Sequence, residues 1–101
     1  MININKGTDF QKKVWEEISK IQRGKVLTYK DIANKIGSPK SSRAVANACG
    51  KNPCIETIHC YRVIRSDGFL GGYSGKGGVK RKKQLLVEEG HKFNNSLKLI
   101  L

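Results

Sequence analysis

The sequence predicts a mainly α-helical protein with a small β element, and three observations support that class. Capping-box patterns at Thr8 and Thr28 each precede apolar residues at helical spacing. A further helical segment follows the second box after a short turn that contains Gly37. The run over 58–64 is apolar and β-branched, which is typical of a strand. For 101 residues we expect one domain over 1–101, with its core over 8–90 and a tail over 91–101.

The composition is that of a soluble protein. Hydrophobic residues make up 38% of the chain and charged residues 28%, which is ordinary for a globular domain. No signal peptide opens the sequence, and no apolar run is long enough to cross a bilayer. We therefore expect a cytoplasmic protein with no membrane partner, and we expect it to be a monomer.

The net charge points to a polyanionic partner. Lys and Arg number 20 against 8 Asp and Glu, which gives a formal charge of +12. Nucleic acid is the first candidate for a small protein with such an excess. The alternative is that the lysines only keep the protein soluble. An anionic membrane surface is a poorer candidate, because no helix pairs a basic face with a broad apolar one.

The 3 cysteines indicate reduced thiols, because an odd number without a secretion signal argues against a disulfide framework. No Cys-x-x-Cys pair occurs, and the spacing of cysteines and histidines matches no common zinc module, so we expect no metal site. Cys49 and Cys54 are expected to be small buried apolar residues.

The first predicted helix begins at Thr8 and ends at Gly24, after a short polar lead-in over 1–7 that is either frayed or a marginal edge strand. The Thr8 hydroxyl caps the free amides, and Gln11 returns the hydrogen bond. The apolar face of this helix is formed by Phe10, Val14, Ile18 and Ile21, with Trp15 beside it. We expect it to be a scaffold helix of the core.

The next two helices form a predicted helix-turn-helix. Thr28 and Asp31 make a capping box for a short helix whose inward residues are Ile32, Ala33 and Ile36, and Gly37 ends it. Ser38 as cap and Pro39 in the first helical position then open a helix over 39–49. The second helix of such a pair enters a groove of DNA.

Arg43 stands out in the third helix because its neighbours are small. These neighbours are Ser41, Ser42, Ala44, Ala46 and Ala48. With nothing bulky around it, the helix backbone can approach another molecule closely and Arg43 can project into a duplex. The alternative is one more solvated arginine.

Beyond this helix the chain is predicted to be extended and then looped. The residues at 50–53 form a turn, and 54–57 lead into the strand over 58–64. After a hairpin-like turn at 65–68, Phe69 and Leu70 could pair back on the preceding segment. The stretch 71–78 holds five glycines in eight positions, which predicts a mobile loop that closes over a ligand or, alternatively, a floppy connector.

The last predicted helix covers 79–89 and turns Val79, Leu85 and Leu86 toward the core. Lys80 to Lys83 form a basic cluster at its start, which is the unfavourable end of the helix dipole for cations. The cost of that placement favours a phosphate-binding role for the cluster. The tail after Gly90 is polar and then apolar.

Cys60 interrupts the strand-like run and is the residue that most needs an explanation. A cysteine is a strong nucleophile only when a cation, a helix N-terminus or a base lowers its pKa. The candidates are Arg62 beside it, the positive end of the recognition helix, and the carboxylate of Glu89. The alternative is an inert thiol.

From about Thr8 to Gly90 the chain resembles the catalytic domain of the O6-alkylguanine-DNA alkyltransferases, which move an alkyl group from guanine in DNA to their own cysteine. The resemblance rests on several blocks in order: Thr28-Tyr29, Arg43-Ala44-Val45, Asn52-Pro53, Cys60 with Arg62-Val63-Ile64, Gly72-Tyr73-Ser74-Gly75, and Leu85-Leu86 with Glu89-Gly90. It implies a winged helix-turn-helix and a double-stranded DNA partner that contains alkylated guanine.

The resemblance also implies roles for single residues. Cys60 resembles the alkyl acceptor, Arg43 the arginine finger that fills the gap left by the flipped base, and Tyr29 the tyrosine that assists flipping. Ser42 and Ala44 beside the finger allow close approach to the minor groove. Asn52 resembles the hinge asparagine, and the carbonyls of Cys60 and Val63 would hold the guanine amine. Arg62 lies beside the acceptor, while Tyr73 and Ser74 would close the pocket. No cofactor is needed.

The chain departs from the family pattern at Tyr61, where the family has the histidine of Pro-Cys-His-Arg. That histidine relays a proton between the cysteine and the glutamate that corresponds to Glu89. With an ordinary pKa of about 10, Tyr61 is a poor base at neutral pH, so we expect Glu89, Tyr61 and water together to assist ionisation. His59 would point to the opposite face of a strand and is no simple substitute.

A second departure is that the N-terminal domain common in the family is absent from this sequence. Relatives of this size include alkyltransferase-like proteins, which lack the cysteine and flag alkylated guanine for excision repair. Because Cys60 is retained, we expect a single-turnover DNA alkyltransferase, methylated-DNA-protein-cysteine methyltransferase by class. The alternatives are a lesion-binding protein without transfer and a plain helix-turn-helix regulator.

Overall fold

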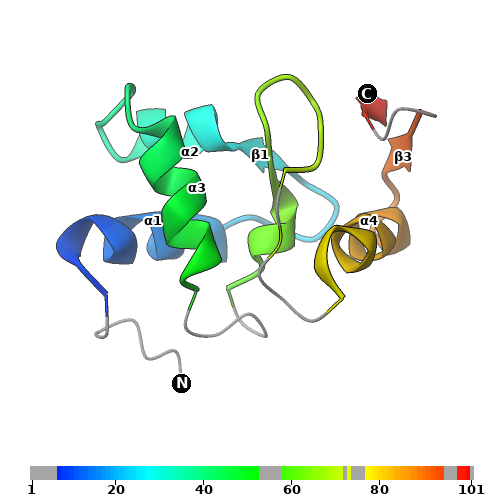
Figure 1. Ribbon diagram of the computed structural model, residues 1–101, viewed down its shortest axis with the longest axis horizontal. Helices are drawn as coiled ribbons and strands as arrows, with labels where there is room; N and C mark the ends of the chain where they lie inside the picture. The colour runs from blue at the N-terminus through cyan, green and yellow to red at the C-terminus, as the bar shows by residue number, and fades with distance from the viewer. Residues whose placement is uncertain (1–6, 53–57, 72, 74–76, 95–97, 101) are drawn as a thin grey trace.

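The computed structural model describes residues 7–52, 58–71, 73, 77–94 and 98–100, and within them the chain is mainly helical with short strands. The helices are α1 (Asp9–Ser19), α2 (Tyr29–Lys35), α3 (Ser42–Gly50) and α4 (Gly78–Glu88), with a short 3₁₀ turn η2 (Cys60–Arg62); the strands are β1 (Leu27–Thr28), β2 (Val63–Ile64), β3 (Lys92–Phe93) and β4 (Leu99–Ile100). This confirms the fold class predicted from the sequence. Figure 1 shows α1, α2 and α3 grouped at one end and α4 at the other, with β1 and β2 between them.

The capping box of α1 is confirmed, whereas its predicted end is wrong. The Thr8 hydroxyl accepts from the Gln11 amide, and the Gln11 side chain accepts from the Thr8 amide. The helix ends at Ser19 rather than Gly24, and Ile21 follows in a turn whose amide donates to the Ile18 carbonyl. Gly24, with φ of +86°, serves the next turn, which brings the chain toward β1.

The helix-turn-helix is present, but α3 begins later than predicted. Thr28 caps α2 in the expected box with Asp31. Ser38 does not cap α3: its amide donates to Ala33 at the end of α2, and its carbonyl accepts from Ser41 in a turn. Ser41 is therefore the N-cap of α3, which starts at Ser42 rather than at Pro39.

Two small sheets complete the architecture. β1 and β2 are parallel, with Leu27 opposite Val63 and Thr28 opposite Ile64. β3 and β4 are antiparallel. Phe69 bridges to Lys98 in the tail, and its carbonyl also accepts from Arg65, so the predicted return on the preceding segment is limited to a turn. Lys98 and Leu99 of the tail thus pack onto the loop that follows β2.

The predicted strand over 58–64 is mostly wrong, because residues Cys60–Arg62 form η2 and the strand is confined to Val63–Ile64. In a strand, Cys60 and Arg62 would share one face and Tyr61 the other. In the structure Tyr61 and Arg62 both reach Glu89, while Cys60 lines a pocket. A 3₁₀ turn lets Tyr61 and Arg62 reach Glu89 while Cys60 faces the pocket, whereas a strand does not. The expectation that His59 and Cys60 point to opposite strand faces fails with it.

The core has two clusters. The larger joins α1, α2, α3 and η2, and in it the Trp15 indole donates to the Ala48 carbonyl at 2.9 Å, which ties α1 to the end of α3. The smaller includes Leu86 of α4 and Leu99 of β4. Leu86 is fully buried and Leu85 half-buried, as predicted, but Val79 is 41% exposed. Val79 lies in the first turn of α4, where the inward positions are those of Lys82 and Leu86.

Across the part of the chain that the structure describes, none of the helices is long and apolar enough to span a bilayer.

Candidate functional site

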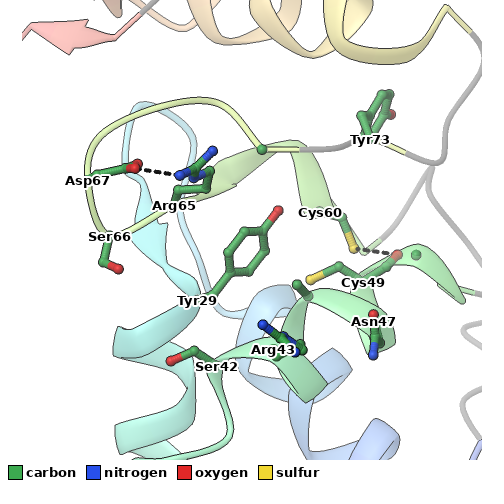
Figure 2. Close-up of a pocket in the computed structure, with 13 residues that line it drawn as sticks. Tyr29, Ser42, Arg43, Asn47, Cys49, Cys60, Arg65, Ser66, Asp67 and Tyr73 are labelled. Atoms are coloured by element: carbon green, nitrogen blue, oxygen red, sulfur yellow. Dashed lines mark hydrogen bonds and ion pairs between the residues drawn. The ribbon is translucent and has the colours of Figure 1, made fainter.

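A pocket of about 860 Å³ lies between α3 and the loop that follows β2. Figure 2 shows that the labelled side chains come to it from different elements, with Tyr29 near its centre. Its lining comprises Tyr29, Ser42, Arg43, Ala46, Asn47, Cys49, Gly50, Cys60, Arg65, Ser66, Asp67, Gly71 and Tyr73. Of the residues proposed from the sequence, the pocket therefore brings together Tyr29, Ser42, Arg43, Cys60 and Tyr73.

Cys60 lies in this pocket with little exposure. Its residue surface is 5% exposed, and its sulfur accepts a hydrogen bond from the Asn52 amide nitrogen at 3.0 Å. The same nitrogen donates to the Ile58 carbonyl at 2.6 Å, so Asn52 links the chain after α3 to the segment before η2. The Cys60 thiol in turn donates to the Cys49 carbonyl at 3.7 Å. Asn52 thus contacts the sulfur without lining the pocket.

The surroundings of Cys60 favour its ionised form. The hydrogen bond from the Cys49 thiol contributes most to lowering the pKa of Cys60; burial opposes it, and the Asn52 amide and the Lys82 ammonium lower it further. The pKa of Cys49 is raised by that same hydrogen bond, by burial and by the charge of Cys60. Cys60 is therefore the thiol that ionises, and Cys49 the one that keeps its proton.

The prediction of a phosphate-binding cluster on α4 is wrong for Lys82, and it stays a prediction for the other three cations of the cluster. Lys80 and Arg81 are exposed, but Lys82 is 0% exposed. Its ammonium lies 3.5 Å from the Tyr29 hydroxyl and 5.7 Å from the centre of that ring. Burial lowers the pKa of Lys82 to about 8, while the charges of Cys49 and Cys60 oppose that change. Lys82 thus lies on the inward face of α4, four residues before Leu86. Its ammonium faces the side of the thiols and not the solvent.

The helix dipole does not act as predicted. The positive end of the recognition helix was expected near Cys60, but the sulfur lies against the carbonyl of Cys49, in the last turn of α3. That is the negative end of the helix, which disfavours a thiolate. Within the described residues, the cation that lowers the pKa of Cys60 is Lys82, and Arg62 has no part in it.

Arg62, Tyr61 and Glu89 form a separate buried cluster that does not line the pocket. The Arg62 guanidinium donates to Glu89 at 2.8 Å, and it also donates to the Ile21 carbonyl at 2.8 Å. The Tyr61 hydroxyl donates to Glu89, and the Gly24 amide donates to it at 3.1 Å. His59 lies 3.2 Å from Arg62 through Nδ1. This cluster joins η2, α4 and the turn before β1.

The pKa values of this cluster follow from its contacts. Burial by itself raises the pKa of Glu89, but hydrogen bonds from Arg62, Tyr61 and Gly24, with the Arg62 charge, lower it to about 2. Burial first and the Glu89 hydrogen bond second raise the pKa of Tyr61 to about 12. In the described part of the chain, the hydrogen-bond partners of the Cys60 thiol are Asn52 and Cys49 rather than Tyr61 or Glu89.

The other proposed residues take varied positions. Arg43 and Ala44 are exposed on α3, and Ser42 is half-buried. Val63 is fully buried in β2. Ser74 and Pro53 lie outside the described residues, as do Cys54, the segment 54–57 that was predicted to be extended, and half of the glycine-rich loop over 71–78. Of that loop, Gly71 and Tyr73 line the pocket.

Sequence reasoning missed Gly71, which forms part of the pocket wall. A Cβ at this position would lie 2.9 Å from the Tyr29 hydroxyl, and φ is +72°. Both the close approach and the left-handed backbone require glycine there. The sequence does not distinguish Gly71 from the other four glycines of the loop. Only the tertiary contact with Tyr29 shows that glycine is required at this position.

Comparisons with known proteins agree with this geometry. A family model for the DNA-binding domain of 6-O-methylguanine DNA methyltransferase matches residues 9–91. The bifunctional transcriptional activator/DNA repair enzyme Ada of Escherichia coli is 48% identical over 84 residues, 83% of this chain and 23% of that protein. The methylated-DNA–protein-cysteine methyltransferase of Saccharomyces cerevisiae is 46% identical over 83 residues, 82% of this chain and 43% of that one. The chain thus spans less than half the length of these two relatives.

Solved structures show the same fold. An OGT–DNA complex from Mycobacterium tuberculosis matches with a TM-score of 0.78 and 44% identity, over 82% of this chain and 50% of that one. S. pombe Atl1, bound to damaged DNA containing O6-carboxymethylguanine, matches with a TM-score of 0.74 and 35% identity, over 90% of this chain and 85% of that one. The family match over residues 9–91, the fold and the pocket around Cys60 lead to one conclusion: this chain belongs to the O6-methylguanine DNA methyltransferase family.

Proposed function

We propose that this protein repairs O6-alkylguanine in double-stranded DNA by transferring the alkyl group to Cys60. The observation that carries the proposal is a sulfur with a lowered pKa at a pocket that also presents Arg43 and Tyr29. The O6 substituent of guanine lies on the base-pairing edge, so the base must leave the stack before any protein atom can reach it. A pocket beside an exposed arginine on α3 fits that requirement.

The reaction needs one covalent step. The Cys60 thiolate attacks the alkyl carbon, a carbon–sulfur bond forms, and the carbon–oxygen bond to guanine breaks with its electrons going to the base. The guanine takes up a proton, for which the Tyr29 hydroxyl in the pocket, 3.5 Å from the Lys82 ammonium, is our candidate donor. The thioether is stable, so each molecule reacts once and no cofactor takes part.

The remaining roles follow the contacts. Arg43 fills the gap left in the stack, with Ser42 and Ala44 leaving room for the backbone of the duplex. Asn52 holds the sulfur to the segment after α3. From the family resemblance alone, Tyr73 and Ser74 would close over the base, and the carbonyls of Cys60 and Val63 would hold its amine. Tyr61 and Glu89 would assist ionisation only through water, and their contacts with Arg62 give them a second role in fixing η2.

A second candidate is a lesion-binding protein that does not transfer the group. It is favoured by Tyr61, which stands at the family's histidine position with a pKa raised to about 12 and therefore supplies no base at neutral pH. The similarity to Atl1 over 85% of that chain supports the same alternative. The two candidates share the pocket and the DNA partner, and they differ in whether Cys60 reacts.

The test is an intact-mass measurement after incubation with a duplex that carries O6-methylguanine. Repair predicts a mass increment of one methyl group that maps to Cys60, is absent in Cys60→Ala, and persists in Cys54→Ser as the matched control. Tight binding of the damaged duplex without a mass change would contradict transfer and support the lesion-binding candidate. Equal affinity for damaged and undamaged duplex would contradict both and leave a plain helix-turn-helix regulator.

A further inference from the structure

The pocket holds a second thiol, Cys49, which the proposed repair reaction does not use as a nucleophile. Cys49 lies in the last turn of α3 and Cys60 in η2, and both line the pocket as reduced thiols. The Cys60 sulfur lies 3.7 Å from the carbonyl of Cys49 itself. Figure 2 shows Cys49 and Cys60 beside each other in the pocket, with the Cys60 sulfur facing the Cys49 carbonyl.

We propose that Cys49 and Cys60 form a dithiol that hydroperoxides oxidise reversibly to an intrachain disulfide, with Cys60 as the attacking thiol and Cys49 as the resolving thiol. Disulfide formation itself does not depend on the repair activity. Its consequence, which rests on the proposed function, is that the oxidised protein cannot accept an alkyl group until a dithiol reductant restores it.

The steps balance with hydrogen peroxide as the oxidant. The Cys60 thiolate attacks one peroxide oxygen, the oxygen–oxygen bond breaks, and the departing hydroxide takes a proton to become water, which leaves a sulfenic acid on Cys60. Cys49 then attacks the Cys60 sulfur, the sulfur–oxygen bond breaks, and the hydroxide leaves with the Cys49 proton as a second water. Two thiols lose two electrons and two protons, and peroxide gains them.

The charges around the pair favour this order. Cys60 is the more acidic thiol, because the Cys49 hydrogen bond, Asn52 and Lys82 stabilise its thiolate. The negative charge of Cys60 is one of the causes that keep Cys49 protonated. Once Cys60 is a neutral sulfenic acid, that opposition disappears, while the Lys82 cation still favours a Cys49 thiolate. Oxidation of Cys60 therefore removes one cause that keeps Cys49 protonated, although burial of Cys49 still raises its pKa.

Burial supports reversibility. Cys49 is 7% and Cys60 5% exposed, so a large thiol cannot easily reach the sulfenic acid from solvent. A resolving thiol already inside the pocket reaches it first and prevents further oxidation to the irreversible sulfinic acid.

The test uses the full chain in a Cys54→Ser background, because Cys54 is the remaining cysteine of the sequence. After treatment with one equivalent of hydrogen peroxide, we expect the loss of two hydrogens in intact mass, a Cys49–Cys60 crosslink in the peptide map, and full reversal by dithiothreitol. In Cys49→Ser and Cys49→Ala in the same background we expect dimedone to trap a Cys60 sulfenic acid, and excess peroxide to give an adduct that dithiothreitol does not reverse.

Phenylarsine oxide, which bridges two adjacent thiols, provides a readout without an oxidant. One arsenical should bind the reduced Cys54→Ser protein and protect both remaining cysteines from iodoacetamide. The proposal is overturned if peroxide gives no Cys49–Cys60 crosslink, if Cys60 oxidises in the same irreversible way with and without Cys49, or if the wild-type crosslink involves Cys54. Each of these readouts is independent of alkyl transfer, so a failure of repair with an intact crosslink would count against the proposed function alone.

Discussion

At the scale of single residues, Lys82 is the least expected member of the site. Removing its charge should raise the pKa of Cys60, because the Lys82 ammonium is one of the groups that lower it. We predict that Lys82→Met slows the reaction of Cys60 with iodoacetamide at neutral pH and moves its pH profile upward, as followed by peptide mass spectrometry. Met fills similar space without the cost of a buried charge, so the free energy of unfolding should not fall.

The matched control is Lys80→Met, which removes an exposed charge from the same helix. Its pH profile should overlay that of the wild type. An unchanged profile in Lys82→Met would show that the charge does not act on the thiol.

Glu89 is the second residue with a testable contribution, here to stability. Its side chain is 1% exposed and holds Arg62 at 2.8 Å. Glu89→Gln leaves that arginine buried without its counter-charge, which should lower the free energy of unfolding by about 3–5 kcal/mol. Glu88→Gln, an exposed neighbour, should change it by less than about 0.5 kcal/mol. Urea unfolding of the two variants measures the difference.

The same carboxylate should make stability depend on pH. Its pKa is about 2 in the folded protein and about 4.3 when unfolded, so its contribution is complete above about pH 4.3 and is lost as the pH falls toward 2. The unfolding free energy of Glu89→Gln should therefore vary less with pH over that window. Parallel curves for variant and wild type would contradict the assignment.

At the scale of elements, α3 supplies both the exposed Arg43 and the buried Cys49. Its exposed side would thus act in base flipping, and its buried side contacts the reactive thiol. Arg43→Ala should slow methyl transfer from duplex DNA, because the arginine stabilises the flipped-out state of the base. If the substitution destabilises that state by about 1.4 kcal/mol, the transfer rate should fall about tenfold. Transfer from free O6-benzylguanine base should be unaffected, because no flipping is needed. Single-turnover rates with both substrates test this.

Lys13→Ala is the control for that experiment, because it removes one exposed charge from α1, away from the residues that line the pocket. It should leave both rates near those of the wild type. If Arg43→Ala slowed both substrates equally, the residue would act on the pocket and not on flipping.

At the scale of the whole molecule, the net charge of +12 should govern binding to undamaged DNA. Contacts between cationic side chains and phosphates release counterions, so affinity should fall at least about tenfold between roughly 50 and 200 mM salt. Fluorescence anisotropy with an undamaged duplex over a salt series measures the slope. If the affinity did not change with salt, the cationic side chains would not bind phosphates, and the lysines would serve only to keep the protein soluble.

The sequence determined the local features of this protein because they depend on neighbours in the chain. Both capping boxes, the helical periods and the helix-turn-helix could be predicted, since each needs only residues a few positions apart. The family blocks identified Cys60 for the same reason. Helix ends were less certain: α3 starts at Ser42 because Ser38 is used to close α2, a competition that no local pattern reveals.

The tertiary structure decided which side chains surround the sulfur. Tyr61 and Arg62 both contact Glu89, which lies 28 and 27 positions further along the chain. Because both side chains reach the same carboxylate, the segment predicted to be a strand forms η2 instead. From the sequence, Lys82 is one of four cations in a predicted phosphate-binding cluster, whereas in the structure α4 packs it against Tyr29. The pKa of Cys60 depends on groups from α3 and α4 brought together by packing, because hydrogen bonds and charges act through space and not along the chain.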